Sequence, residues 1–96
     1  MYVEERVYTL QIGKTAEYFR NYEEYGLPVQ LKHLPHLVGY YFTEAGPLNQ
    51  VIHLWAYDSL DERDRLRGEL AKNPDWLAYL PKTGGMITKQ IGRAHV

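Results

Sequence analysis

The chain has 96 residues, 45% hydrophobic and 24% charged, which is enough for one globular domain and leaves little room for a second. Its net charge of −1, from 11 Lys and Arg against 12 Asp and Glu, lacks the basic excess of most nucleic-acid-binding proteins. The chain contains no cysteine, which excludes disulfides and cysteine nucleophiles and fits a cytoplasmic location. No apolar run is long enough to span a bilayer and the first residues do not resemble a signal peptide, so we expect no nucleic-acid or membrane partner.

The first half of the chain alternates between strand and helix patterns. Residues 3–12 are rich in β-branched and aromatic side chains, which predicts a strand that ends before Gly13. From Lys14 onward large side chains recur every three or four residues, which predicts a helix with one inward-facing stripe. That stripe consists of Tyr18, Tyr22, Tyr25 and Val29. Such a stripe is typical of core packing, although buried hydroxyls need partners, which favours a wet cavity between helix and sheet.

Glycine and proline punctuate the next segment. Residues 26–28, Gly-Leu-Pro, are expected to break or kink the helix, and a second short helical piece then runs to about His33. Residues 37–44 predict a second strand and residues 45–49 a turn. A third strand is predicted over residues 51–57, and both of its faces are apolar or aromatic, which indicates burial on both sides.

The second half of the chain begins with two helices. Ser59 and Glu62 form a capping box, which predicts a helix running to about Lys72. The alternating charges of this helix, among them Arg63, Arg65 and Arg67, are typical of a solvated face. Asn73 and Pro74 then start a second short helix. Residues 83–85 predict a loop, and residues 86–91 predict the fourth strand.

The resulting order is β-α-β-β-α-β, the ferredoxin-like arrangement of the α+β class. It implies a mostly antiparallel four-stranded sheet with the helices on one face and strands one and three in the centre. The central strands carry apolar side chains on both faces, and so short a chain has no second layer to cover the open face. We therefore expect a homodimer in which two sheets meet face to face.

The last six residues have an unusual origin in this interpretation. Residues 91–96, Ile-Gly-Arg-Ala-His-Val, back-translate with permitted codons into the start of a widely used sequencing adapter. We therefore expect a single domain over residues 1–90 and a non-native tail, from adapter read-through, over residues 91–96. The alternative is a natural tail that happens to match.

Chemically useful side chains gather on the two central strands. Successive side chains of a strand point to opposite faces of the sheet. In the third predicted strand His53 therefore shares a face with Trp55 and Tyr57, and in the first Arg6 shares a face with Tyr8. If the two faces coincide, they form a pocket with aromatic walls and a few polar groups that could orient a ligand. The ligand-binding candidates are Arg6, Tyr8, Tyr22, His53, Trp55 and Tyr57. His53 is also the candidate for acid-base catalysis. The alternative is a core or dimer interface in which these side chains satisfy one another.

One further histidine pair has a spacing that occurs in metal sites. His33 and His36 have the His-x-x-His spacing, but Pro35 between them breaks the helix that would align the two rings. No further ligands accompany the pair in the sequence. We therefore expect no metal and no cofactor.

Several segments resemble the NIPSNAP family. The most specific is residues 46–57, Gly-Pro-Leu-Asn-Gln-Val-Ile-His-Leu-Trp-Ala-Tyr. Shorter matches are Tyr8-Thr9-Leu10, Gly13-Lys14, Gly26-Leu27-Pro28, Gly39-Tyr40, Thr43-Glu44, Ser59-Leu60, Arg63 and Pro74-Asp75-Trp76. The resemblance covers about residues 3–87 and implies a dimeric α+β barrel. It supplies no family-wide catalytic residues, so Asn49, His53 and Arg63 are matched positions without assigned roles.

The resemblance implies less about function than about fold. Bacterial single-domain relatives mostly lack an assigned activity, and the wider barrel superfamily includes cofactor-independent monooxygenases and isomerases that react between helices and sheet. We expect a homodimeric domain that binds a small apolar or aromatic molecule in such a pocket. The first alternative is a cofactor-independent enzyme of the monooxygenase or isomerase type, in which His53 acts with Tyr8 or Tyr57. The second is a purely structural or protein-interaction dimer without a cavity.

Overall fold

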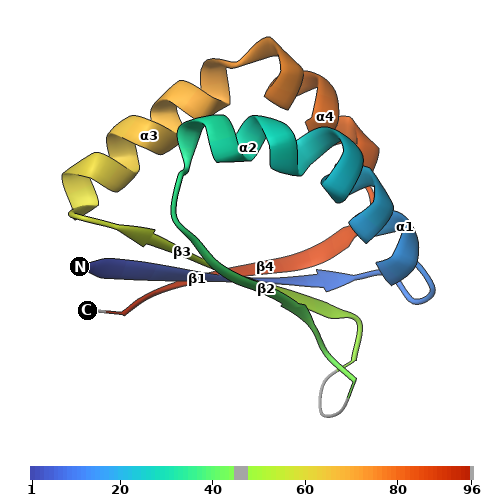
Figure 1. Ribbon diagram of the computed structural model, residues 1–96. Helices are drawn as coiled ribbons and strands as arrows, with labels where there is room; N and C mark the ends of the chain where they lie inside the picture. The colour runs from blue at the N-terminus through green and yellow to red at the C-terminus, as the bar shows by residue number, and fades with distance from the viewer. Residues whose placement is uncertain (45–47, 96) are drawn as a thin grey trace.

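The computed structural model, which describes residues 1–44 and 48–95, consists of one sheet covered on one face by helices (Figure 1). The strands are β1 (Tyr2–Leu10), β2 (Leu37–Phe42), β3 (Gln50–Tyr57) and β4 (Ile87–His95). The helices are α1 (Thr15–Asn21), the π-helical segment η1 (Tyr22–Gly26), α2 (Leu27–His33), α3 (Leu60–Lys72) and α4 (Pro74–Gly84). Within the described ranges, no helix has the length and apolar character needed to cross a membrane.

The sheet has the strand order β2-β3-β1-β4, and every neighbouring pair is antiparallel. This confirms the predicted ferredoxin-like α+β fold with strands one and three in the centre. Arg6 lies opposite His53 in the register of β1 and β3. The two predicted polar faces therefore coincide, and they face the helices.

The other face of the sheet is open in the single chain, as Figure 1 shows. One row of apolar side chains crosses all four strands on this face. By register the row consists of Tyr41, Ile52, Val7 and Ile91. Alternate residues of β3 are buried under the helices, whereas Ile52, Leu54 and Ala56 keep part of their surface exposed. Burial of β3 on both faces, as the sequence predicts, is thus not achieved within one chain.

Residues 26–28 were predicted to break or kink the helix; the chain stays helical from Thr15 to His33, and the irregularity is a π turn that ends at Gly26. In place of a break, the Leu27 N–H donates to the Tyr22 carbonyl, five residues back, which defines the π turn η1. Pro28 then falls in the first turn of α2 and, because it has no N–H, it donates no backbone hydrogen bond to the turn before it. The short helical piece that ends at His33 is confirmed.

The π turn also changes which side chains face inward. The π turn contains one extra residue, which rotates Tyr25 out of the predicted stripe and leaves it 42% exposed. The Lys82 ammonium lies 4.5 Å from the centroid of the Tyr25 ring. Gly26 is buried in place of Tyr25. An ideal Cβ on Gly26 would lie 2.6 Å from Cζ of Tyr79, so helix α4 packs directly against the glycine backbone.

Replacing Gly26 with alanine is expected to lower the free energy of unfolding by about 1–3 kcal/mol, because the buried Tyr79 ring must move. Gly68→Ala is the matched control: no atom lies within 4 Å of an added Cβ there, and alanine is the better helix former by about 1 kcal/mol. Urea unfolding of the two variants should therefore shift in opposite directions. Equal shifts would contradict the close packing of α4 on η1.

The predicted loop at residues 83–85 is also wrong in part, because α4 continues through Gly84. Thr83 is buried, and its carbonyl accepts hydrogen bonds from the N–H groups of Gly85 and Met86. The Asn21 side chain donates to the Lys82 carbonyl at 3.1 Å, which fixes the end of α4 to α1. The long-range hydrogen bond from Asn21 and the local ones to the Thr83 carbonyl stabilise the last helical turn against the two glycines that follow Thr83.

Strand β4 is longer than predicted and extends from Ile87 to His95 through most of the suspected tail. Its register against β1 continues, for example with Glu5 opposite Arg93. Strand pairing uses backbone groups and requires no particular side chains. The pairing therefore leaves the origin of residues 91–96 open, and the non-native tail stays a prediction.

Candidate functional site

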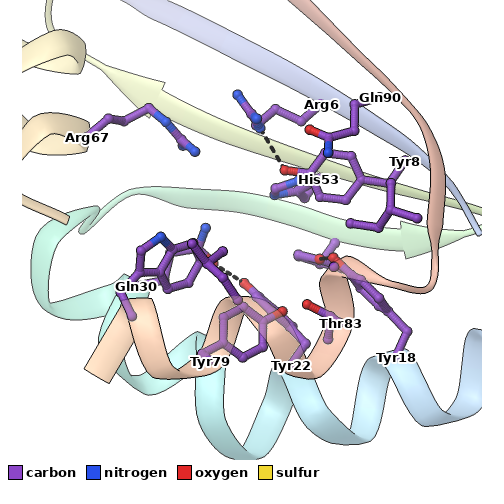
Figure 2. A pocket seen from close by; sticks show the side chains of 15 residues that line it. Arg6, Tyr8, Tyr18, Tyr22, Gln30, His53, Arg67, Tyr79, Thr83 and Gln90 are labelled. Carbon is purple, nitrogen blue, oxygen red and sulfur yellow. Dashed lines mark hydrogen bonds between the residues drawn. The ribbon is translucent and has the colours of Figure 1, made fainter. Parts of the chain in front are cut away.

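A cavity of about 240 Å³ lies between the helices and the helix-facing side of the sheet. Figure 2 shows aromatic side chains from both layers around it. Four of the predicted ligand-binding residues line this cavity, namely Arg6, Tyr8, Tyr22 and His53. Strands β1 and β3 supply three of them and the helical layer supplies Tyr22.

The other two predicted residues are buried beside the cavity and are absent from its lining. The indole Nε1–H of Trp55 donates to Nδ1 of His53 at 2.7 Å. The hydroxyl of Tyr57 lies 3.5 Å from a terminal nitrogen of Arg67. Trp55 and Tyr57 thus contact lining residues, and a direct contact with a ligand stays a prediction for both.

Sequence reasoning missed several residues that complete the lining. Among them are Tyr18, which the sequence placed only in the inward-facing stripe, and Gln30, Tyr40, Arg67, Trp76 and Tyr79. A signal was available for Tyr40, which lies opposite His53 in the register of β2 and β3. Gln30 and Tyr79 had no local signal, because the π turn sets the phase of α2 and α4 reaches the cavity only through tertiary packing.

The tyrosines form a hydrogen-bonded aromatic wall. Tyr22 stacks on Tyr40 with ring centroids 4.5 Å apart, and the hydroxyls of Tyr18 and Tyr40 lie 3.1 Å from each other. The Tyr22 hydroxyl donates to Oε1 of Gln30 at 2.5 Å. Burial raises the pKa of Tyr18, Tyr22 and Tyr40 well above the ordinary tyrosine value. All three phenols are therefore neutral near pH 7 and act only as hydrogen-bonding groups.

His53 is 2% exposed and is held in one tautomer. Because Nδ1 accepts from Trp55, the proton of the neutral ring is on Nε2. Nε2 is buried and has no hydrogen-bond partner among the described residues. Burial, together with the positive charges of Arg6 and Arg67, lowers the pKa of His53 to about 3. The ring is therefore a neutral hydrogen-bond donor at physiological pH.

A cluster of arginines surrounds the buried carboxylate of Glu4 at one side of the cavity. Arg63 donates two hydrogen bonds to Oε2 of Glu4, at 2.7 and 3.2 Å. Arg6 lies 3.6 Å from Oε2, and Arg67 lies 3.7 Å from Oε1. The predicted solvated face of α3 is therefore wrong for Arg63 and Arg67, whose side chains are 27% and 18% exposed, and it holds for Arg65, at 62%.

Asn49 and His33 have structural roles. Asn49 adopts a φ of 61°, a left-handed conformation that asparagine tolerates, and its carbonyl accepts from the Leu10 N–H at 2.7 Å. His33 lies at the end of α2, where its Nε2 is 3.0 Å from Nδ2 of Asn73. Across the described residues, no three His, Cys, Asp or Glu side chains are grouped so that they could hold a metal ion.

Comparison with known proteins identifies one family. The NIPSNAP family model matches residues 3–94. The human protein NipSnap homolog 3A is 35% identical over 92 residues, which is 94% of this chain and 36% of that protein. The crystal structure of protein Atu4242 from Agrobacterium tumefaciens has a TM-score of 0.99 at 38% identity, and the match covers 100% of this chain and 92% of that one.

A more distant structural match extends the fold beyond this family. An antibiotic biosynthesis monooxygenase-like protein from Nitrosomonas europaea has a TM-score of 0.71 at 11% identity, over 100% of this chain and 97% of that one. At this identity the likeness establishes the fold alone. The chain spans about a third or less of the length of the curated relatives from human and Dictyostelium discoideum that it matches.

Proposed function

Because this chain belongs to the NIPSNAP family, we propose that it is a homodimeric domain that binds a small aromatic or otherwise apolar molecule between its helices and its sheet. The observation that carries the proposal is the cavity of about 240 Å³, which has aromatic walls and polar groups at a few positions. A purely structural dimer would have no need of this space. Native mass spectrometry of the purified protein tests both parts, since a retained ligand adds mass to the dimer.

The open face of the sheet supports the homodimer. Its apolar row, the residues Tyr41, Ile52, Val7 and Ile91, lies across the middle of a face that the chain itself leaves uncovered. A second copy related by a two-fold axis would present the same row and bury both. The NIPSNAP resemblance, which implies a dimeric α+β barrel, agrees with this assembly.

Replacing Ile52 with glutamate is expected to convert the dimer into a monomer, because two unpaired carboxylates would be buried at the centre of the interface. Leu77→Glu is the matched control, since Leu77 is a leucine 53% exposed on α4, on the opposite side of the molecule. Native mass spectrometry and light scattering at one protomer concentration should give a monomer for Ile52→Glu and a dimer for Leu77→Glu. A wild-type monomer would contradict the proposed assembly.

The surroundings of His53 favour binding over acid-base catalysis. A general base needs a free lone pair, and the lone pair of Nδ1 already accepts the Trp55 N–H. The lowered pKa of about 3 also makes the ring a poor proton acceptor near pH 7. We therefore assign His53 a role in orienting the ligand rather than in proton transfer.

The cytoplasmic location expected from the sequence stays a prediction.

A further inference from the structure

The polar groups at one side of the cavity carry an excess of positive charge. Three guanidinium groups, those of Arg6, Arg63 and Arg67, share the single buried carboxylate of Glu4. Asp64 forms an ion pair with Arg63 at 3.0 Å, but the Asp64 side chain is 62% exposed, so its negative charge lies at the solvent side of the cluster. The arginines are therefore not fully neutralised by the chain itself.

Arg6 and Arg67 are the two members of this cluster that line the cavity. Nε of Arg6 donates to the hydroxyl of Tyr8 at 3.0 Å, and the nearest carboxylate oxygen lies 3.6 Å from a terminal nitrogen of Arg6. Arg67 has only long contacts, 3.5 Å to the Tyr57 hydroxyl and 3.7 Å to Glu4. A guanidinium group has five N–H donors, so most donors of both arginines have no close acceptor among the described residues. Figure 2 shows the two side chains extending toward each other from β1 and α3.

A third unused donor lies in the same lining. The Nε2–H of His53 is buried and has no hydrogen-bond partner in the described part of the chain. Buried polar atoms in native proteins nearly always have a partner, so an exception on a cavity wall points to a missing acceptor. The three groups have the same requirement, because each of them donates and none accepts.

We infer that the ligand of this cavity is a small planar carboxylic acid whose carboxylate binds between Arg6 and Arg67 and whose ring lies against the tyrosine wall. Two guanidinium groups match the two oxygens of a carboxylate, and the flat body matches the stacked Tyr22 and Tyr40. The volume of 240 Å³ holds about eight water molecules, which leaves room for one aromatic ring and its acid group. This inference rests on the cavity being a ligand site, as proposed above.

Three probes test the inference by isothermal titration calorimetry with the full chain, and the two that carry a ring are matched in size. Benzoate carries the ring and the charge, benzamide carries the ring without the charge, and inorganic phosphate carries charge without the ring. We expect benzoate to bind at least tenfold more tightly than benzamide and than phosphate. Raising the salt concentration should weaken benzoate binding and leave benzamide unchanged.

Variants of the two arginines assign the preference to the proposed residues. Arg67→Gln and Arg6→Gln are each expected to reduce the ratio of benzoate to benzamide affinity about tenfold, whereas Arg67→Lys should retain a preference for benzoate. Arg65→Gln, on the exposed face of α3, should leave the ratio unchanged. The ratio is measured within one variant, so a general loss of stability does not change it.

The possible failures are distinguishable. If benzamide binds as tightly as benzoate, the cavity is a ligand site but the inference of an acid is overturned. If phosphate binds as tightly as benzoate, the aromatic part of the inference is overturned. If none of the three binds below about 10 mM, both the inference and the proposed ligand cavity fail.

Discussion

Replacing Glu4 with glutamine is expected to lower the free energy of unfolding by about 3 kcal/mol, one of the two largest effects that we predict for this chain. Glu4 is 7% exposed and lies near the start of β1, where its carboxylate faces the guanidinium groups of Arg6, Arg63 and Arg67. Glutamine has nearly the same shape but no charge, so the variant would leave three guanidinium groups close together with only the exposed Asp64, on Arg63, as a counter-charge. Removing one partner of a buried ion pair lowers the stability of the fold because the remaining charge stays in a poorly solvated site.

Glu69→Gln provides the matched control for this substitution. Glu69 forms an ion pair with Arg65 at 3.6 Å on the same helix as Arg63, but both partners are more than half exposed. Exposed pairs of this kind contribute about 0–0.5 kcal/mol, so the control should unfold like the wild type. Urea unfolding followed by tryptophan fluorescence measures both variants at one protomer concentration. Similar stability of Glu4→Gln and Glu69→Gln would show that the buried carboxylate does not hold the cluster together.

The Glu4 cluster also explains why part of the site could not be predicted. The sequence places Arg63, Arg65 and Arg67 in one run of alternating charges. On a predicted helix such a run indicates a solvent-exposed face. Which of them turns inward depends on the position of a carboxylate 59 residues earlier in the chain. Patterns within a short window carry no information about that contact.

The order of the elements, in contrast, was predictable from local signals. Alternation in β1 and β3, the capping box at Ser59 and the Asn73-Pro74 start of α4 each depend on neighbouring residues. The sequence placed Arg6 and His53 each on one face of its strand, and the register of β1 and β3 shows that the two faces coincide. The π turn was missed because a glycine and a proline close together normally end a helix, and here the packing of Tyr79 on Gly26 stabilises a continuous one.

The second large effect that we predict is a loss of stability in acid that depends on His53. Burial and the two arginines lower the pKa of this ring to about 3, from an ordinary value of 6.5. Between these two values the unfolded chain binds a proton at His53 that the folded chain does not bind. Stability therefore rises with pH through this window and falls on acidification, by up to about 1.4 kcal/mol per pH unit. At about pH 4.5 the contribution of His53 amounts to a loss of about 2–3 kcal/mol relative to pH 7.

His53→Gln should remove this slope, because glutamine does not titrate and its amide oxygen can still accept the Trp55 N–H. Urea unfolding from about pH 7 to about pH 4.5 is expected to show a wild-type stability that falls more steeply than that of the variant. His36→Gln removes an exposed histidine and should keep the wild-type slope. If His53→Gln and the wild type lose stability in parallel, His53 is not a neutral buried donor, and it becomes available again as a proton-transfer group. The same measurement therefore separates the orienting role proposed for His53 from the catalytic one.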